Sequence, residues 1–256
     1  MNWNFKRLKK IQTKNPILIE GLPGMGNVGK IALDFMVENL KAEKIAEITS
    51  HSFPHCVFVN EDNLVELPKI TLYQKNISNQ SFLFLAGDIQ PLDEKACYEF
   101  CELLLDFLVE QKGKEIITLG GIGQQKVPEH PKVFCTANSQ KIIKQYAMKG
   151  LNAEIHGVVG PIIGVTGLLV GVAEQRQIPA IAFLAETYGH PTHLGIKGAR
   201  EILKILDAKL KLKLDLNQLN SEIEQIEKSR KKIEEIKKVG LFGKKKSNED
   251  HTDYIG

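Results

Sequence analysis

The stretch GLPGMGNVGK, residues 21–30, follows the apolar run PILIE and precedes a segment whose apolar residues have helical spacing. Gly24, Gly26 and Gly29 satisfy the G-x-G-x-x-G spacing of a dinucleotide-binding turn, and with Lys30 they nearly satisfy the phosphate-binding P-loop. Both motifs place a tight turn between a strand and a helix, so that the first backbone N–H groups of the helix face an anion. The stretch therefore predicts an α/β fold. It leaves two roles open for the turn, namely ligand binding or close packing of a strand against a helix.

Strands and helices are expected to alternate along most of the chain. Apolar, β-branched or aromatic runs predict strands, whereas apolar residues three or four apart predict helices. The expected strands are 15–21, 44–50, 56–67 with a hairpin-like turn NEDN at 60–63, 69–76, 81–88, 115–121 and 178–187, and the expected helices are 28–43, 92–114, 139–151, one within 160–177 and one from Lys197. Such alternation predicts a three-layer α/β sandwich, with a mostly parallel mixed sheet and helices on both of its faces.

The pattern changes after the globular part, for which we expect a core domain over 1–207. An extended helix is expected over 208–240 and a flexible basic tail over 241–256. A seven-residue repeat carries the helix prediction, with Leu212, Leu219, Ile226 and Ile233 at one position and Leu216 and Ile223 at the interleaved one. Arg230 interrupts the repeat. Such a helix packs either on a partner helix or back on its own domain, and the sequence favours neither.

Charge and composition argue against several classes of partner. The 34 Lys and Arg residues nearly balance the 31 Asp and Glu residues, so the chain has no general attraction for nucleic acid or membrane. The longest uncharged stretch, 157–173, is interrupted by Gly and Pro and is shorter than the ~20 apolar residues of a spanning helix. The N-terminus has no apolar core of a signal peptide. We therefore expect a cytoplasmic protein with reduced cysteines that binds neither nucleic acid nor membrane.

The P-loop interpretation lacks one component. A P-loop lysine is followed by Ser or Thr, whose hydroxyl binds magnesium, whereas Lys30 is followed by Ile31. Asp88, after the apolar run SFLFLAG, could stand for the acidic strand end that holds the metal. For the dinucleotide interpretation, Glu47 lies at about the right distance for the ribose contact but in the middle of a strand. The alternative site for a nucleotide- or nucleoside-binding enzyme comprises Gly24, Gly26, Gly29, Lys30 and Asp88.

Two further groups of polar residues could carry chemistry. Glu186, His190 and His193 follow a predicted strand, but the histidines lack the spacing of a zinc-binding pair, so a loop with a helix cap is the favoured interpretation. Cys97 and Cys101 share one helix face, and His51, His55 and Cys56 are close in sequence, but buried thiols are more common than metal sites. The sequence therefore predicts no catalytic residue and no metal site.

Four blocks of sequence, taken together, resemble one family. They are GLPGMGNVGKIALDFMVENL (21–40), LAGDIQP (85–91), TLGGIG (118–123) and GPIIGVTGLLVGVAEQRQIPAIAFLAETYGHP (160–191). In this order they resemble the archaeal branch of the proteasome assembly chaperone 2 family, over roughly residues 15–207. The resemblance implies a phosphorylase/hydrolase-like α/β sandwich that is non-enzymatic and has no cofactor. It also implies a homo-oligomer whose partners are proteasome α subunits or a paralogous chaperone chain.

The resemblance also implies roles for particular residues. Gly21, Gly24, Gly26 and Gly29 would serve turn dihedral angles and close strand–helix approach, without a nucleotide. Some archaeal relatives end in a hydrophobic residue, Tyr and any residue, a motif that inserts between proteasome α subunits. This chain ends Asp253-Tyr254-Ile255-Gly256, with the tyrosine one place early. The residues expected to bind partners are Tyr254, Ile255 and Gly256 in the tail and Leu219, Ile223 and Ile226 in the helix.

Overall fold

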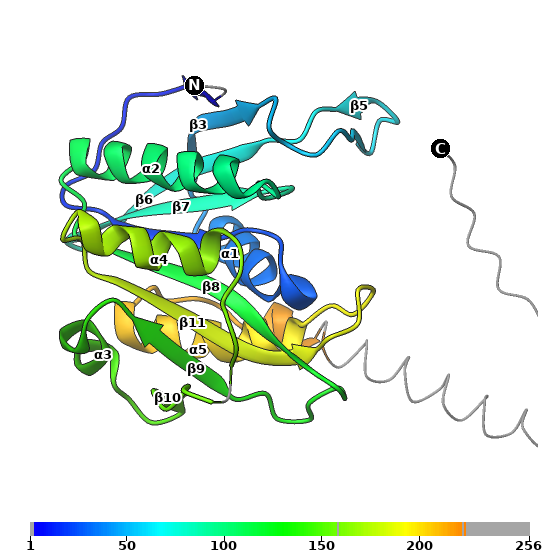
Figure 1. The fold of residues 1–256 in the computed structure, drawn as a ribbon, viewed down its shortest axis with the longest axis vertical. Helices are drawn as coiled ribbons and strands as arrows, with labels where there is room; N and C mark the ends of the chain where they lie inside the picture. The colour runs from blue at the N-terminus through cyan, green and yellow to red at the C-terminus, as the bar shows by residue number, and fades with distance from the viewer. Residues whose placement is uncertain (1–2, 158, 222, 224–256) are drawn as a thin grey trace, which may run out of the picture. The chain divides into compact units, whose positions relative to one another are not determined.

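Nine strands form one hydrogen-bonded sheet in the described part of the chain, in the order β1-β3-β6-β7-β2-β8-β11-β9-β10 (Figure 1). This computed structural model describes residues 3–157, 159–221 and 223. The strands of the sheet are β1 (Trp3–Arg7), β2 (Ile17–Gly21), β3 (Glu43–Ser50), β6 (Ile70–Ile77), β7 (Gln80–Gly87), β8 (Glu115–Gln124), β9 (Val133–Ala137), β10 (Leu151–Asn152) and β11 (Ala180–Tyr188). A separate hairpin consists of β4 (Phe58–Val59) and β5 (Val65–Glu66), joined by the predicted turn at 60–63.

The expectation of a mostly parallel sheet was wrong. Strands β7, β2, β8 and β11 run parallel to one another in the centre, and β10 runs parallel to β9. The pairings β1–β3, β3–β6, β6–β7 and β9–β11 are antiparallel. One reason is the connection between β6 and β7, which has only the two residues 78–79, because a two-residue link permits only an antiparallel hairpin. The sheet is therefore mixed, with as many antiparallel as parallel pairings.

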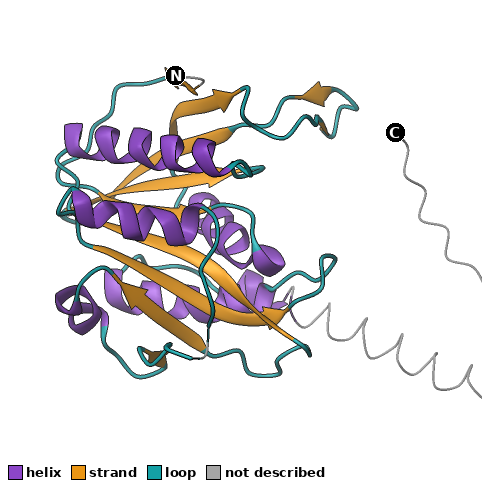
Figure 2. Cartoon of the chain, in the orientation of Figure 1, coloured by secondary structure: helices purple, strands orange, loops and turns teal. Residues whose placement is uncertain are grey.

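Helices cover both faces of this sheet, as predicted for a three-layer sandwich. They are the 3₁₀ turn η1 (Met25–Asn27), α1 (Val28–Asn39), α2 (Glu94–Glu110), α3 (Gln140–Tyr146), α4 (Val165–Gln175) and α5 (Ile196–Leu210). Helices α2 and α4 pack together on one face, and α1 and α5 pack together on the other (Figures 1 and 2). Side chains alternate along each strand, so Leu18 of β2 joins the core under α2 and α4, whereas Ile17 and Ile19 face the opposite way.

The chain divides into two units, residues 1–215 and 216–256. The first contains the sheet and helices α1 to α5, and α5 continues beyond the predicted boundary at 207. In the second, residues 217–221 are helical, and the side chains of Leu219 and Ile223 are buried. Ile226, Tyr254, Ile255, Gly256 and the tail predicted over 241–256 lie outside the described residues. The predicted division into segments 1–207, 208–240 and 241–256 stays a prediction.

Candidate protein-interaction surface

The glycines of the turn allow three backbone segments to touch. A Cβ atom added to Gly29 would lie 2.2 Å from the carbonyl oxygen of Leu119 on β8, and one added to Gly21 would lie 2.4 Å from the carbonyl oxygen of Gly29. A Cβ atom on Gly121 of β8 would likewise lie 2.3 Å from the carbonyl oxygen of Met25. Because real Cβ contacts are not this short, the strand, the turn and the helix pack this closely only with glycine at these positions.

Gly26 faces the interior of the protein. Its φ of 59° lies in the left-handed region, and its missing Cβ would lie 2.5 Å from Oγ1 of Thr187 on β11. The Gly26 carbonyl accepts a 2.7 Å hydrogen bond from the N–H of Gly195, directly before α5. Gly24 differs, because its backbone is extended and an added Cβ would meet only Gln90, at 4.0 Å. The close approach implied by the family resemblance is therefore present at Gly21, Gly26 and Gly29, and absent at Gly24.

The residues of the nucleotide alternative lie near the carboxyl ends of the neighbouring strands β2 and β7. Gly24, Gly26, Gly29 and Lys30 share the turn, and Asp88 follows β7, the strand beside β2. The Lys30 ammonium contacts the Asp34 carboxylate at 2.9 Å and the Gly87 carbonyl at 3.2 Å. Glu47, the candidate ribose contact, is on β3, which β6 and β7 separate from β2.

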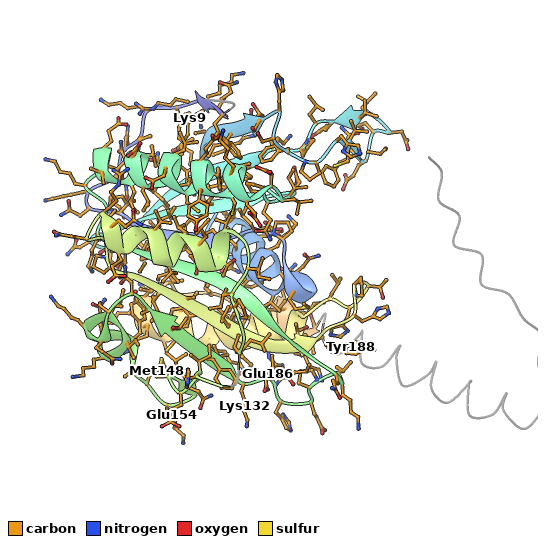
Figure 3. All side chains as sticks on the ribbon, viewed as in Figure 1. Lys9, Lys132, Met148, Glu154, Glu186 and Tyr188 are labelled. Carbon is orange, nitrogen blue, oxygen red and sulfur yellow. The ribbon has the colours of Figure 1, made fainter. Side chains whose placement is uncertain are left out.

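Glu186, on β11, and the two histidines, in the loop that follows β11, have contacts within the chain. Glu186 Oε2 accepts a 2.9 Å hydrogen bond from the N–H of Lys132, which ties β11 to the residues before β9 (Figure 3). The His190 ring stacks on Tyr188 with centroids 5.7 Å apart, and His193 packs edge-on against the same ring at 5.6 Å. Nδ1 of His190 is 2.9 Å from the Thr192 hydroxyl oxygen. These contacts fit a loop, but the N-cap residue of α5 is Gly195, which has no side chain to cap the helix.

Cys97 and Cys101 are buried on α2, as the thiol interpretation expects, whereas Cys56 is exposed. The hydrogen bond between Cys97 and Cys101 lowers the pKa of Cys97 and, together with burial, raises that of Cys101. Among the described residues, no three His, Cys, Asp or Glu side chains are grouped closely enough to hold a metal ion.

One buried carboxyl group was not singled out from the sequence. Glu20 is the penultimate residue of β2 and is fully buried. Its Oε1 accepts a 2.9 Å hydrogen bond from the N–H of Leu22, and its Oε2 lies 3.4 Å from the Thr166 hydroxyl oxygen. Burial raises the pKa of Glu20 to about 8, against the opposing effect of these hydrogen bonds. The sequence signal was a single carboxylate near the end of an otherwise apolar strand.

Exposed apolar side chains gather at one edge of the sheet. Strands β2, β7, β8 and β11 are parallel, so their carboxyl ends share this edge, and the pair Ile70–Gly87 brings the segment between β3 and β6 to the same edge. The loop before α4 joins them, because Gln90 Oε1 accepts a hydrogen bond from the N–H of Val165. The apolar edge comprises Met25, Val57, Phe58, Val59, Leu64, Val65, Leu67, Leu92, Ile163 and Leu194.

These ten residues have exposed fractions between 41% and 87%, and only three other large hydrophobic residues of the described chain are exposed. Scattered exposed apolar residues are ordinary, whereas a gathered set is typical of a protein-interaction surface. The loops that carry them surround the carboxyl ends of the central strands (Figures 1 and 2). This edge is therefore the candidate functional site. None of the described helices combines the length and the apolar content needed to cross a bilayer.

Comparison with known proteins identifies relatives along nearly the whole chain. It is 28% identical over 255 residues to the uncharacterized Methanocaldococcus jannaschii protein MJ1210, covering 98% of this chain and 96% of that protein. The same identity and length relate it to MJ0106 of that organism, with 98% of each chain covered.

Solved structures have the same fold. Pyrococcus furiosus PbaB, described as an archaeal proteasome activator, matches with a TM-score of 0.82 and 29% identity, over 91% of this chain and 99% of that one. Pyrococcus furiosus PbaA, described as an archaeal homolog of proteasome-assembly chaperone, matches with a TM-score of 0.77 and 23% identity, over 94% and 95% of the two chains.

The family model described as PAC2 family matches residues 18–234. This match covers most of the chain and confirms the resemblance recognised from the four sequence blocks. The chain belongs to the PAC2 family.

Proposed function

We propose that this chain is a non-catalytic protein, similar to proteasome assembly chaperones, that forms oligomers and binds proteasome α subunits or a related chaperone chain. The observation that carries the proposal is the apolar edge, where loops from separate parts of the sequence expose large apolar side chains together. A surface of this kind gains free energy when another protein covers it. The description of PbaB as a proteasome activator, at 29% identity, supports a proteasome-related partner.

The glycine turn supports a structural role over a catalytic one. Gly26, the glycine that in a dinucleotide site lets the backbone approach the pyrophosphate, faces Thr187 and Gly195 of its own chain. Lys30 is engaged by Asp34 and the Gly87 carbonyl. The geometry therefore favours a turn whose glycines hold β2, α1, β8 and β11 together.

Partner capture tests the proposal. The full chain is tagged, co-expressed with proteasome α subunits or with another PAC2-family chain from the same organism, and purified under mild conditions. We expect one of these partners to be recovered. The double variant Leu92→Glu/Leu194→Glu adds two charges to the apolar edge and should reduce recovery at least tenfold, because a buried unpaired carboxylate opposes association.

Val109→Glu is the matched control. Val109 is 51% exposed but lies near the end of α2 that is remote from the apolar edge, so this variant should recover as much partner as the unmodified chain. Failure of the full chain to capture either partner would refute the proposal. Deletion of residues 254–256 in the same assay tests whether Tyr254, Ile255 and Gly256 contribute, and substitution of Leu219, Ile223 and Ile226 does so for the helix.

A further inference from the structure

The β4–β5 hairpin exposes one wholly aliphatic face. In its register Phe58 pairs with Glu66 and Val59 pairs with Val65. Val57 and Leu67 flank the two strands, and continuation of the same register places them on the face of the second pair. We call residues 57–67 the arm, and Val57, Val59, Val65 and Leu67 the aliphatic face. Their exposed fractions are 52%, 67%, 69% and 74%.

The opposite face of the arm carries the exposed Phe58 and Leu64 together with the polar side chains of Asn60 and Glu66. Oδ1 of Asn60 accepts hydrogen bonds from the N–H groups of Asp62, at 3.1 Å, and Leu64, at 2.9 Å. Its Nδ2 donates to Glu66 Oε1 at 2.9 Å, and Glu66 contacts the ammonium of Lys69 at 2.8 Å. These contacts fix the turn and the pairing of the two strands. The arm is thus organised by polar contacts on one side, while its aliphatic side faces solvent.

This arrangement is the reverse of an ordinary amphipathic hairpin, in which the apolar face lies on the core. A two-stranded hairpin is only marginally stable in water without further packing. The arm lies outside the nine-stranded sheet and projects from its edge (Figures 1 and 2). Packing of a partner on the aliphatic face would therefore stabilise the arm.

We propose that the aliphatic face of the arm packs against the same face of a second copy of this chain. The proposal deepens the proposed function by naming the contact that builds the oligomer. Interfaces of permanent homo-oligomers are strongly apolar, whereas those of transient partners are about as polar as the remaining surface. The aliphatic face has no polar side chain, which fits a permanent partner. Two such faces can also pack on one another, because each offers the same three valines and one leucine on a two-stranded ribbon.

Charge selects the relative direction of the two arms. The tip carries the exposed carboxylates Glu61 and Asp62, whereas the exposed His51 and His55 lie near the base. An antiparallel arrangement around a two-fold axis places each acidic tip over the base of the other arm. A parallel arrangement would bring the Glu61 and Asp62 carboxylates of both arms together, and these like charges would repel one another. The contact is therefore expected to be antiparallel, with the Val59–Val65 pairs near the axis.

Particle mass tests this contact. The double variant Val59→Lys/Val65→Lys places two ammonium groups on the aliphatic face. We expect light scattering of the purified full chain to show fewer copies per particle than the unmodified chain has at the same concentration. Val109→Lys is the control, since Val109 is 51% exposed but lies on α2, outside the apolar edge, so its particle mass should not change. Circular dichroism confirms that both variants are folded.

A cross-link tests the direction of the arms. In a Cys56→Ser background, which removes the exposed natural thiol, Val65→Cys should form a disulfide-linked dimer on mild oxidation, whereas Leu64→Cys should not. A folded Val59→Lys/Val65→Lys variant with unchanged mass would overturn the inference, as would a monomeric unmodified chain.

The capture assay separates this inference from the proposed function. Smaller particles that still capture proteasome α subunits support both. Smaller particles from a chain that captures no partner support the arm contact and refute the proposed function. If the Val59→Lys/Val65→Lys variant keeps its particle mass but no longer captures α subunits, the arm contacts the proteasome instead of a second copy. That result overturns the inference and leaves the proposed function standing.

Discussion

At the scale of single residues, Glu20 couples the stability of the fold to pH. Its carboxyl group is fully buried near the end of β2, and burial raises its pKa from the ordinary 4.5 to about 8. Between these two values the folded chain binds the proton more tightly than the unfolded chain does. The free energy of unfolding therefore falls as pH rises through this window, because ionisation of the buried group disfavours the folded state.

We expect Glu20→Gln to remove this pH dependence. The amide is always neutral and its oxygen can accept the same hydrogen bond from the N–H of Leu22. At pH 4.5 the free energies of unfolding of Glu20→Gln and of the unmodified chain should be nearly equal. At pH 8.5 the free energy of unfolding of Glu20→Gln should be higher by a few kcal/mol, since each unit of pKa shift corresponds to about 1.4 kcal/mol. Urea titration at both pH values measures the difference.

Other carboxylates do not obscure this comparison. The pKa values of Glu43 and Glu47 are lowered by hydrogen bonds to Lys9 and Lys44, so their contributions are lost as pH falls through those lowered values. These contributions are the same in the unmodified chain and in Glu20→Gln, and they cancel in the difference. A gain that did not vary between pH 4.5 and pH 8.5 would show that Glu20 does not titrate as described.

At the scale of elements, the strand–turn–helix at the start of the sheet and the strands β7 and β8 beside it were largely predictable, whereas some outer strands were not. The strand, the glycine turn and the helix follow from local sequence, because the glycines, the apolar run and the helical spacing are contiguous. The strands β1 and β9 escaped prediction. In β1 only Trp3 and Phe5 are apolar, which is too few to indicate a strand. Their rings pack on Phe100 and Phe107 of α2, at centroid distances of 4.8 and 5.1 Å, and these contacts are visible only in the fold.

Strand direction was also beyond local sequence. The antiparallel pairing of β9 with β11 joins residues that lie more than forty positions apart, as Val133 pairs with Ala185. Hydrogen-bonded pairing of distant segments depends on the packing of the whole sheet, which apolar periodicity does not encode. The glycine turn shows the same limit, since the packing of Gly26 against Thr187 is visible only in the fold.

The packing of strand against helix gives a second prediction, at Gly29. An added Cβ would lie 2.2 Å from a backbone carbonyl, which cannot move without displacing β8. Gly29→Ala should therefore reduce the free energy of unfolding by about 1–3 kcal/mol, as overpacking does. Gly171→Ala is the control, because Gly171 lies within α4 with no atom within 4 Å of its Cβ position, and alanine there should add about 0.5–1 kcal/mol. Thermal unfolding of both variants gives the comparison, and equal shifts would contradict the packing argument.

At the scale of the whole molecule, the apolar edge is the feature that the sequence could not predict. Met25, Leu92, Ile163 and Leu194 come from separate connections between strands and helices, and no sequence pattern links them to one another. The parallel central strands bring their loops together at one edge, and only then do they become a surface. The sequence did predict the family and the hairpin turn at 60–63, but not which side chains of the hairpin face solvent.

The heptad-patterned helix and the arm make opposite predictions about assembly. If the arm joins the copies, a chain truncated after Asp215 should keep the same number of copies per particle, because residues 57–67 belong to the first unit. It should also unfold cooperatively, since that unit contains the sheet and both of its helical layers. Light scattering of the truncated and full chains, compared at equal concentration, gives the copy number. A folded truncated chain that is monomeric would assign assembly to the residues beyond Asp215, where Leu219, Ile223 and Ile226 were predicted to bind a partner.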